Sequence, residues 1–381
     1  MLLEGILVVE SGSGIATAYC GRVLRSLGAT VIKVESRETP DWVRSYGAAC
    51  ATHPRASSTW CHLNGAKVRV VLHASDAGTL TALLAPADLV IAGPDLLGER
   101  AAAACPASAA LVQIVPAVDG PAGFAVHADE SAGVAAGLRD PFAGNVPPGG
   151  LRMDIAQVNA GAHAAATATL ALTARELGNS EPIRVQVGVY EAALSMIEIA
   201  AQNLLLQGKF GGGLPDMMTA TAAPPPYVCS DGGMVAINLW GKDVWTRMCE
   251  VMERPDMASD ARFTDTASRY AHPGEIREIL MTWCASVTRD VAVARMRAGL
   301  IPSAPVLGFD ETLRDEQLLA RGLVGTDVGH PRAMGSCYVI DGARDALPYL
   351  DPATAIDLLQ GPPSLRFSVS EADDAVVVEL R

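Results

Sequence analysis

Asp154 is the residue whose place in the sequence most clearly suggests chemistry. It stands directly before a helical stretch that the sequence predicts to run to about Leu177 and to stop at Gly178. A carboxylate there can cap the first free N–H groups of the helix and meets the positive end of its dipole. Kept ionised by the same groups, it can also attack an activated carbonyl carbon. The pattern leaves both roles open, a structural cap and a covalent nucleophile.

Glycines mark two further candidate sites. The turn Ser11–Gly14 follows the first predicted strand, but Thr17 breaks the pattern of a dinucleotide-binding loop. Such a turn either offers N–H groups to an anion or is a plain structural connection. Gly211, Gly212 and Gly213 are followed directly by Leu-Pro, and they predict either a mobile flap over a substrate or a flexible connection.

Other catalytic patterns are weak or missing. His127 and Asp129 lie in an irregular segment between residues 120 and 150, where they could form an acid–base pair or a surface contact. The sequence has no GxSxG, P-loop or HExxH pattern, which removes the main support for a serine hydrolase, a nucleotidase or a zinc protease. The eight cysteines are scattered without a CxxC pair, so we expect reduced thiols and no metal site.

Composition excludes several classes of protein. The chain has 381 residues, a formal charge of −13 and a pI near 5.0, which argues against a nucleic-acid or anionic-membrane partner. Half of the residues are hydrophobic, yet no apolar run reaches the roughly 18 residues of a membrane span. The mean hydropathy of +0.24 reflects alanine, much of it in the stretch 155–174. The first residues lack the features of a signal peptide, so we expect a cytoplasmic protein.

Alternating short apolar runs and helical stretches predict the elements that must position these residues. Strands are expected at residues 6–9, 31–34, 68–72, 89–91 and 111–115, with helices between them at 15–27, 76–84 and 96–104. This alternation is typical of a parallel, Rossmann-like doubly wound sheet. The Gly- and Pro-rich break at residues 208–226 is the best domain boundary, and we expect residues 367–380 to return to the first domain.

Several stretches, in the same order, resemble family III CoA-transferases, the group that includes formyl-CoA transferase, the carnitine CoA-transferases and α-methylacyl-CoA racemase. The stretches are LLEGILVVESGSGIATAYCGRVLRSLGATVIKVE, LNGAKVRVVL, the Ala87-Asp88 pair, RELG with IRVQVGVYEA, GGGLPDM, IPSAPV and DEQLLARGLV. The resemblance covers nearly the whole chain. Any one stretch is weak, but their shared order is fairly specific.

The resemblance implies a fold and an assembly. It implies an α/β fold with a Rossmann-like large domain built from both chain ends, residues 1–207 and 307–381, and a smaller α+β domain at 227–306. The Gly/Pro-rich segment 208–226 would be flap and linker. Two subunits would thread through each other as interlocked rings, either as a homodimer or as a heterodimer with a second family member.

It also implies a reaction and a set of site residues. CoA thioesters would be substrates, with a carboxylic acid as acceptor and no permanently bound cofactor. Asp154 would form an aspartyl-CoA thioester under the flap of Gly211, Gly212 and Gly213. Four cations are matched to CoA binding: Arg37, Arg44, Lys67 and Arg100.

This sequence also departs from the family pattern near the nucleophile. The spacing from Asp154 to Arg175 is a few residues longer than expected, and on a shorter spacing the position falls on Ala156, Gln157 or Val158. Three hypotheses therefore stand in order: a CoA-transferase, a non-catalytic partner subunit of a heteromeric CoA-transferase, and a racemase or epimerase of α-methylacyl-CoA.

Overall fold

The computed structural model describes residues 1–50, 56–73, 75–119, 154–196, 198, 202, 205–206, 226–239, 243–324, 335–342, 367–372 and 375–380. The chain divides into two compact units. One comprises Met1–Leu138, Pro148–Met196 and Glu316–Arg381, and the other comprises Arg139–Pro147 and Ile197–Asp315. Each unit is described by itself.

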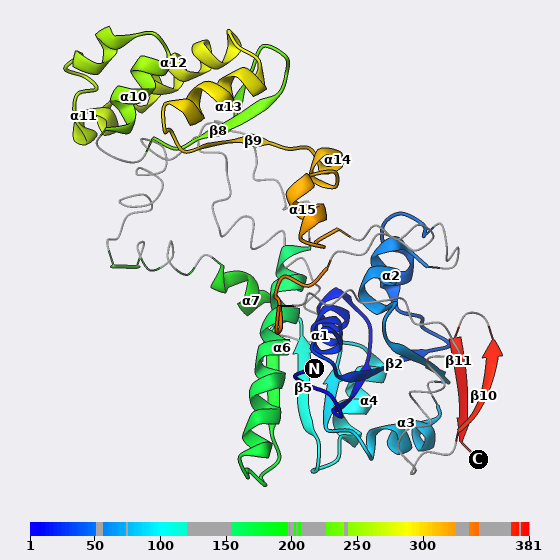
Figure 1. Ribbon diagram of the computed structural model, residues 1–381. Helices are drawn as coiled ribbons and strands as arrows, with labels where there is room; N and C mark the ends of the chain where they lie inside the picture. Colours follow the sequence, from blue (N-terminus) through cyan, green and yellow to red (C-terminus); the bar gives the residue numbers. More distant parts are fainter. Residues whose placement is uncertain are drawn as a thin grey trace. The chain divides into compact units, whose positions relative to one another are not determined.

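An eight-stranded sheet forms the centre of the first unit, in the order β10-β11-β3-β2-β1-β4-β5-β6 (Figure 1). The six strands from β3 to β6 run parallel. Their bounds are β1 (Leu7–Ser11), β2 (Thr30–Ser36), β3 (Val68–Leu72), β4 (Leu89–Ala92), β5 (Ala110–Val115) and β6 (Arg184–Gly188). The order 3-2-1-4-5-6 is that of a doubly wound nucleotide-binding sheet, as the alternation predicts.

Helices cover both faces of this sheet. The helices are α1 (Ile15–Ser26), α2 (Ser58–Asn64), α3 (Ala77–Leu84), α4 (Leu96–Ala104), α6 (Ile155–Glu176) and α7 (Val189–Ser195). Because strand side chains alternate, Val8 packs into a core with α1, α6 and α7, while Val9 packs into a core with α3 and α4. Strands that are buried on both faces have continuous apolar sequences, and for this reason they can be recognised in the amino-acid sequence.

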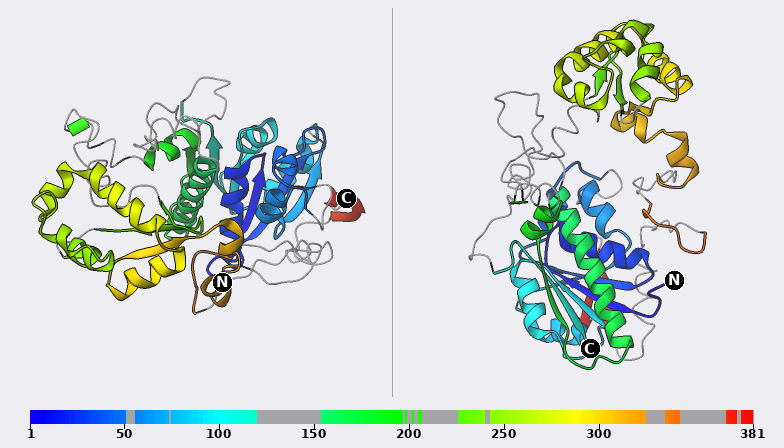
Figure 2. Two further views of the ribbon diagram at one scale, coloured as in Figure 1. Left: turned by 90° about the horizontal axis from the view of Figure 1, so that it is seen from above. Right: turned by 90° about the vertical axis from the view of Figure 1, so that its left-hand side faces the viewer.

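The alanine-rich helix α6 lies against α1 and one face of the sheet (Figure 2). Small residues let the two helices approach closely: a Cβ on Gly161 would lie only 2.7 Å from the carbonyl oxygen of Ala16. The buried residues of α6 lie on the side that faces α1 and the sheet. Leu170 on the other side is 67% exposed.

The C-terminal part of the chain contributes β10 (Phe367–Ala372) and β11 (Ala375–Leu380) to the same sheet. Strand β11 runs parallel to β3, with Val376 opposite Val70, and β10 pairs antiparallel with β11 at the edge. The sheet therefore contains strands from both ends of the chain.

The second unit has a three-stranded antiparallel sheet of β7 (Tyr227–Val228), β8 (Met234–Ile237) and β9 (Ser303–Val306). Its helices include α10 (Val244–Val251), α11 (Thr266–Ala271), α12 (Pro273–Ala285), α13 (Arg289–Ala298) and α14 (Phe309–Thr312), while α15 (Glu316–Ala320) belongs to the first unit. Trp245 and Phe263, both fully buried, pack in its core with ring centroids 5.5 Å apart. In the described part of the chain, no helix is long and apolar enough to cross a membrane.

The loops after β1 and β4 diverge to opposite sides of the sheet at the point where the strand order reverses. Doubly wound sheets bind their ligands at such a crevice. Glycines allow close packing here: a Cβ on Gly12 would lie 2.9 Å from the Cα of Gly93 in the other loop. Within the β4–α4 connection, a Cβ on Gly98 of α4 would lie 2.1 Å from the carbonyl oxygen of Gly93. Gly12 also has a φ of 102°, which disfavours any side chain.

We predict that Gly98→Ala destabilises the first unit by about 1–3 kcal/mol, because its new methyl group would press on the backbone of Gly93. Gly78→Ala is the matched control, since Gly78 is exposed near the start of another helix and its Cβ meets nothing closer than 3.9 Å. The control should leave stability equal or slightly higher. Urea denaturation of both variants measures the difference, and equal midpoints would contradict the close loop contact.

Candidate active site

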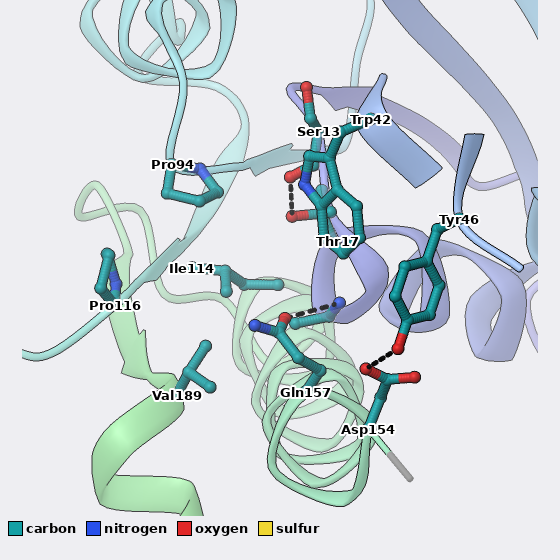
Figure 3. A pocket seen from close by; sticks show the side chains of 12 residues that line it. Ser13, Thr17, Trp42, Tyr46, Pro94, Ile114, Pro116, Asp154, Gln157 and Val189 are labelled. Atoms are coloured by element: carbon teal, nitrogen blue, oxygen red, sulfur yellow. Dashed lines mark hydrogen bonds between the residues drawn. The ribbon is translucent and has the colours of Figure 1, made fainter. Parts of the chain in front are cut away.

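A cavity of about 310 Å³ opens at the carboxyl ends of β1, β4, β5 and β6 (Figure 3). The described residues that line it are Ser13, Gly14, Ala16, Thr17, Trp42, Tyr46, Pro94, Ile114, Pro116, Asp154, Gln157 and Val189. All of them belong to the first unit. The cavity therefore lies at the strand-order reversal.

Asp154 occupies the N-cap position of α6 but does not cap it. Its side chain accepts no hydrogen bond from the first turn of the helix, so the cap interpretation is wrong in this respect. One carboxylate oxygen instead accepts a hydrogen bond of 3.0 Å from the hydroxyl of Tyr46 (Figure 3). The carboxylate is thus held at the cavity, near the positive end of the helix dipole, and its oxygens do not accept hydrogen bonds from the helix amides.

Gln157 lies one turn further along α6 and is 9% exposed. Its Oε1 atom accepts a hydrogen bond of 3.3 Å from the amide of Ala16. Its Nε2 atom has no hydrogen-bond partner among the described residues, and Figure 3 shows this atom on the other side of the amide from the dashed hydrogen bond. The amide is therefore fixed at one end and presents a donor to the cavity.

One amide of the Ser11–Gly14 turn is already bound within the protein, because the amide of Gly14 donates to Asp41 Oδ1 at 3.2 Å. Just after the turn, the amide of Ala16 in α1 donates to Gln157. These two contacts favour the structural interpretation of the turn. Ser11 itself belongs to β1.

Beneath this loop lies a buried charge cluster made of Glu10, Lys33, Asp41 and Lys67, each at most 4% exposed. Glu10 and Lys33 are opposite each other on β1 and β2, and their charged atoms are 3.0 Å apart. The ammonium of Lys33 also contacts Asp41 at 3.1 Å, and Lys67 binds Glu10 at 2.7 Å. Two cations and two anions balance, which is the condition for burying charge at all.

The cluster also fixes the backbone around the cavity. Lys33 donates to the carbonyl of Gly12 at 2.6 Å, while Asp41 accepts from the amides of Gly14 and Val43. Asp41 thereby caps the short 3-10 helix η1 (Trp42–Ser45). The glycine loop and the Trp42 segment are both tied to the same buried ions.

The electrostatics of the cluster favour these charged states. Burial would lower the pKa of Lys33, but the carboxylates of Asp41, Glu10 and Glu35 outweigh burial and raise it. Burial would raise the pKa of Asp41, but Lys33 and the two backbone amides hold it below its usual value. Burial lowers the pKa of Lys67 to about 8, because the carboxylate of Glu10 does not offset burial and Lys33 repels the ammonium. The Lys33 centre is therefore the firmer part of the cluster.

Trp42 and Tyr46 form the outer rim of the cavity. They are 46% and 42% exposed, and their rings meet edge to face with centroids 5.4 Å apart. Packing of the rings holds the Tyr46 hydroxyl toward Asp154 (Figure 3).

None of the four cations matched to CoA lines the cavity. Lys67 is 2% exposed, and its ammonium donates to Glu10, Ala18 and Asn64, so a direct contact of Lys67 with CoA is corrected to a structural role. Arg44 forms two hydrogen bonds to Glu35 and stacks over Trp60.

The other predicted residues divide into two groups. Arg37 and Arg100 are exposed on the first unit, before η1 and on α4. The flap glycines Gly211, Gly212 and Gly213, and the pair of His127 and Asp129, lie outside the described residues. Among the described residues, no group of three or more His, Cys, Asp or Glu side chains could hold a metal ion.

Several residues of the site were not predicted from the sequence: the charge cluster around Lys33 and the aromatic rim of Trp42 and Tyr46. A signal for the charge cluster was present, because Glu10 and Lys33 interrupt otherwise apolar strands, where a charge must be paired. Trp42 and Tyr46 carry no such signal, since only the three-dimensional fold brings their segment beside α6.

Comparison with known proteins identifies the family. The family model of CoA-transferase family III matches residues 3–95 and 118–347. The chain belongs to this family. It is 24% identical to the succinyl-CoA–D-citramalate CoA-transferase of Chloroflexus aurantiacus, over 84% of this chain and 82% of that protein. It is 28% identical to the alpha subunit of the succinyl-CoA–L-malate CoA-transferase of the same organism, over 84% of this chain and 77% of that protein.

Solved structures agree on the fold. A CaiB/BaiF family protein from Brucella suis has a TM-score of 0.79 and 20% identity, covering 94% of this chain and 98% of that one. The predicted α/β class with a parallel sheet and the resemblance to family III are therefore confirmed, while the interlocked dimer stays a prediction.

We predict that Lys33→Met destabilises this family III protein by about 3–5 kcal/mol, because it leaves Glu10 and Asp41 buried without their shared cation. Arg37→Ala removes an exposed cation nearby and should change stability by no more than about 0.5 kcal/mol. Denaturant unfolding measures both values. Similar losses in the two variants would show that the buried cluster does not hold the loops.

Proposed function

We propose that this protein moves CoA from an acyl-CoA to a carboxylic acid, with Asp154 as the covalent nucleophile. The observation that carries the proposal is the uncapped Asp154 carboxylate, which faces a cavity at the strand-order reversal of a family III CoA-transferase. A helix-capping aspartate would have its oxygens turned to the helix amides. This one has Oδ1 bound to Tyr46, and no partner of Oδ2 is recorded among the described residues.

In the proposed first half-reaction, Oδ2 of Asp154 attacks the thioester carbon of the donor, and the C–S bond breaks. The products are an aspartyl acyl anhydride and CoA thiolate. The thiolate then attacks the Asp154 side of the anhydride, which releases the donor acid as a carboxylate and leaves an aspartyl-CoA thioester.

The second half-reaction is the reverse with another acid. The acceptor carboxylate attacks the aspartyl-CoA carbon and expels CoA thiolate, which then attacks the acceptor side of the new anhydride. This forms the product thioester and restores the Asp154 carboxylate. Every nucleophile is already an anion, so the cycle needs no general base and no net proton transfer. The described lining, which holds no His or Cys, is compatible with such a cycle.

The side chains around Asp154 have positioning roles in this scheme. Tyr46 fixes one carboxylate oxygen, so the other is presented to the thioester. The free N–H bonds of Gln157 could stabilise an oxyanion formed beside it. Arg37, Arg44 and Arg100 remain candidates for the nucleotide part of CoA, and Gly211, Gly212 and Gly213 for a flap. A dimer, with itself or with a second family member, remains part of the proposal.

We predict that incubation with an acyl-CoA and hydroxylamine converts Asp154 to a hydroxamate, because hydroxylamine cleaves activated acyl groups. Peptide mass spectrometry locates the modification. Asp154→Asn should abolish it and reduce CoA transfer by at least about a thousandfold, since an amide does not form the anhydride.

Asp76→Asn is the matched control. Asp76 caps α3 by accepting from the amide of Thr79, outside the cavity, and asparagine preserves such a cap. This variant should keep full activity and full labelling of Asp154. An unmodified Asp154 peptide in an actively transferring protein would contradict the nucleophile assignment.

One observation favours a second candidate, a non-catalytic subunit. Gln157, more buried than Asp154, places an amide on the cavity side of α6, and an amide is no nucleophile. Two relatives are named as alpha and beta subunits of one succinyl-CoA–L-malate CoA-transferase. Such a subunit should co-purify with a second family member, so full activity of this chain alone would rule it out.

A further inference from the structure

The cavity has two chemically different sides. Tyr46, Asp154 and Gln157 make up the polar side. The opposite side, here called the apolar wall, consists of Pro94, Ile114, Pro116 and Val189 (Figure 3). The proposed reaction takes place at the polar side. The apolar wall is therefore free to contact the acyl chain that is attached to the thioester carbon.

The side chains of the apolar wall carry no hydrogen-bond donor. Ile114 and Val189 are 1% and 2% exposed and belong to the main core cluster, so their positions are set by core packing. Pro94 and Pro116 have no backbone N–H, and they stand where the ends of β4 and β5 would otherwise offer one to an anion.

Among the described residues, a negative charge stands directly beside the apolar wall. Asp95 follows Pro94, accepts from the amide of Gly98 at 2.8 Å and contacts the hydroxyl of Ser13. It thereby occupies the N-terminal amide of α4 that could otherwise bind a carboxylate. The part of the lining that the structure describes contains no Lys, Arg or His.

We infer that the acyl group carried in this cavity is short, uncharged and apolar, and that it lies against the apolar wall. This inference rests on the proposed CoA transfer at Asp154. At the apolar wall a terminal carboxylate would lose its water without gaining a cation from the described residues, and it would share the cavity with the carboxylate of Asp154, which is costly. A cavity of about 310 Å³ is at the small end of ligand pockets, which favours a short chain. The relatives named for succinyl-CoA, malate and citramalate are named for dicarboxylic acids, so the inferred substrate class differs from theirs.

The test compares two acyl groups of similar shape in the full-length protein. Succinyl-CoA ends in a carboxylate, and 4-methylpentanoyl-CoA carries an isopropyl group in its place. Each is mixed with its own carbon-13-labelled acid, and the entry of label into the thioester measures transfer without a known acceptor. We expect kcat/KM to be at least about 100-fold higher for 4-methylpentanoyl-CoA. Equal or faster exchange with succinyl-CoA would overturn the inference.

A variant pair tests the apolar wall itself. Pro116→Arg adds a cation, and Pro116→Gln is the uncharged control. Relative to the control, Pro116→Arg should shift the exchange ratio toward succinyl-CoA by about tenfold. An unchanged ratio in a folded Pro116→Arg variant would count against the apolar wall as the acyl site. If circular dichroism shows that the variant does not fold, the wild-type ratio decides alone.

Calorimetric binding of both acyl-CoAs separates failure of the inference from failure of the proposed function. No exchange with either pair, together with tighter binding of 4-methylpentanoyl-CoA, would contradict the transferase activity and support the apolar acyl site. Tighter binding of succinyl-CoA would contradict the inference, whatever the exchange rates.

Discussion

The ammonium of Lys33 is the interaction on which the candidate site depends. It is fully buried among Glu10, Asp41 and the carbonyl of Gly12, and its carboxylate partners in turn hold Lys67, Gly14 and the start of η1. A buried cation of this kind contributes little net stability compared with an apolar residue, but it is costly to leave its partners unpaired. Lys33 contributes mainly to the geometry of the site, because its ammonium holds both the loop after β1 and the segment that carries Trp42 and Tyr46.

A second constraint is steric. Helix α6 approaches α1 closely because its glycine and alanine residues are small, and Gly161 lies against Ala16 and Tyr19 of α1. The start of α6 therefore reaches the cavity, where Gln157 binds the amide of Ala16 and Asp154 meets Tyr46. The alanine that raises the mean hydropathy of the chain has a structural purpose in this packing, although α6 leaves one side exposed.

Much of the fold could be predicted from the sequence, because strands buried on both faces give short apolar runs that are hard to mistake. The strand at residues 68–72 was predicted with its observed bounds, and the helix after Asp154 to within a residue or two. The α/β class and the parallel sheet followed from the alternation of these elements. The first strand was predicted two residues short at its end, because Glu10 and Ser11 are polar yet buried.

The candidate site was less predictable, for physical reasons. Whether Asp154 caps its helix depends on the orientation of one side chain, which no local pattern determines. The family resemblance makes Lys67 a candidate for CoA binding, but Lys67 precedes β3 and is buried beside β1, where it pairs with Glu10. The rim aromatics depend on the path of residues 37–46 around the strand ends, and this path is set by Asp41 and Lys33.

The most direct test of the account is the fate of oxygen in the carboxylate of Asp154. The full-length protein is incubated with an acyl-CoA and the corresponding acid, whose carboxylate is labelled with oxygen-18. The mass of the peptide that contains Asp154 is then measured by mass spectrometry. If the acid attacks an aspartyl-CoA thioester, breakdown of the anhydride leaves one labelled oxygen on Asp154. We predict that the label appears in that peptide and increases with turnover. Transfer of CoA without any label on Asp154 would contradict the account.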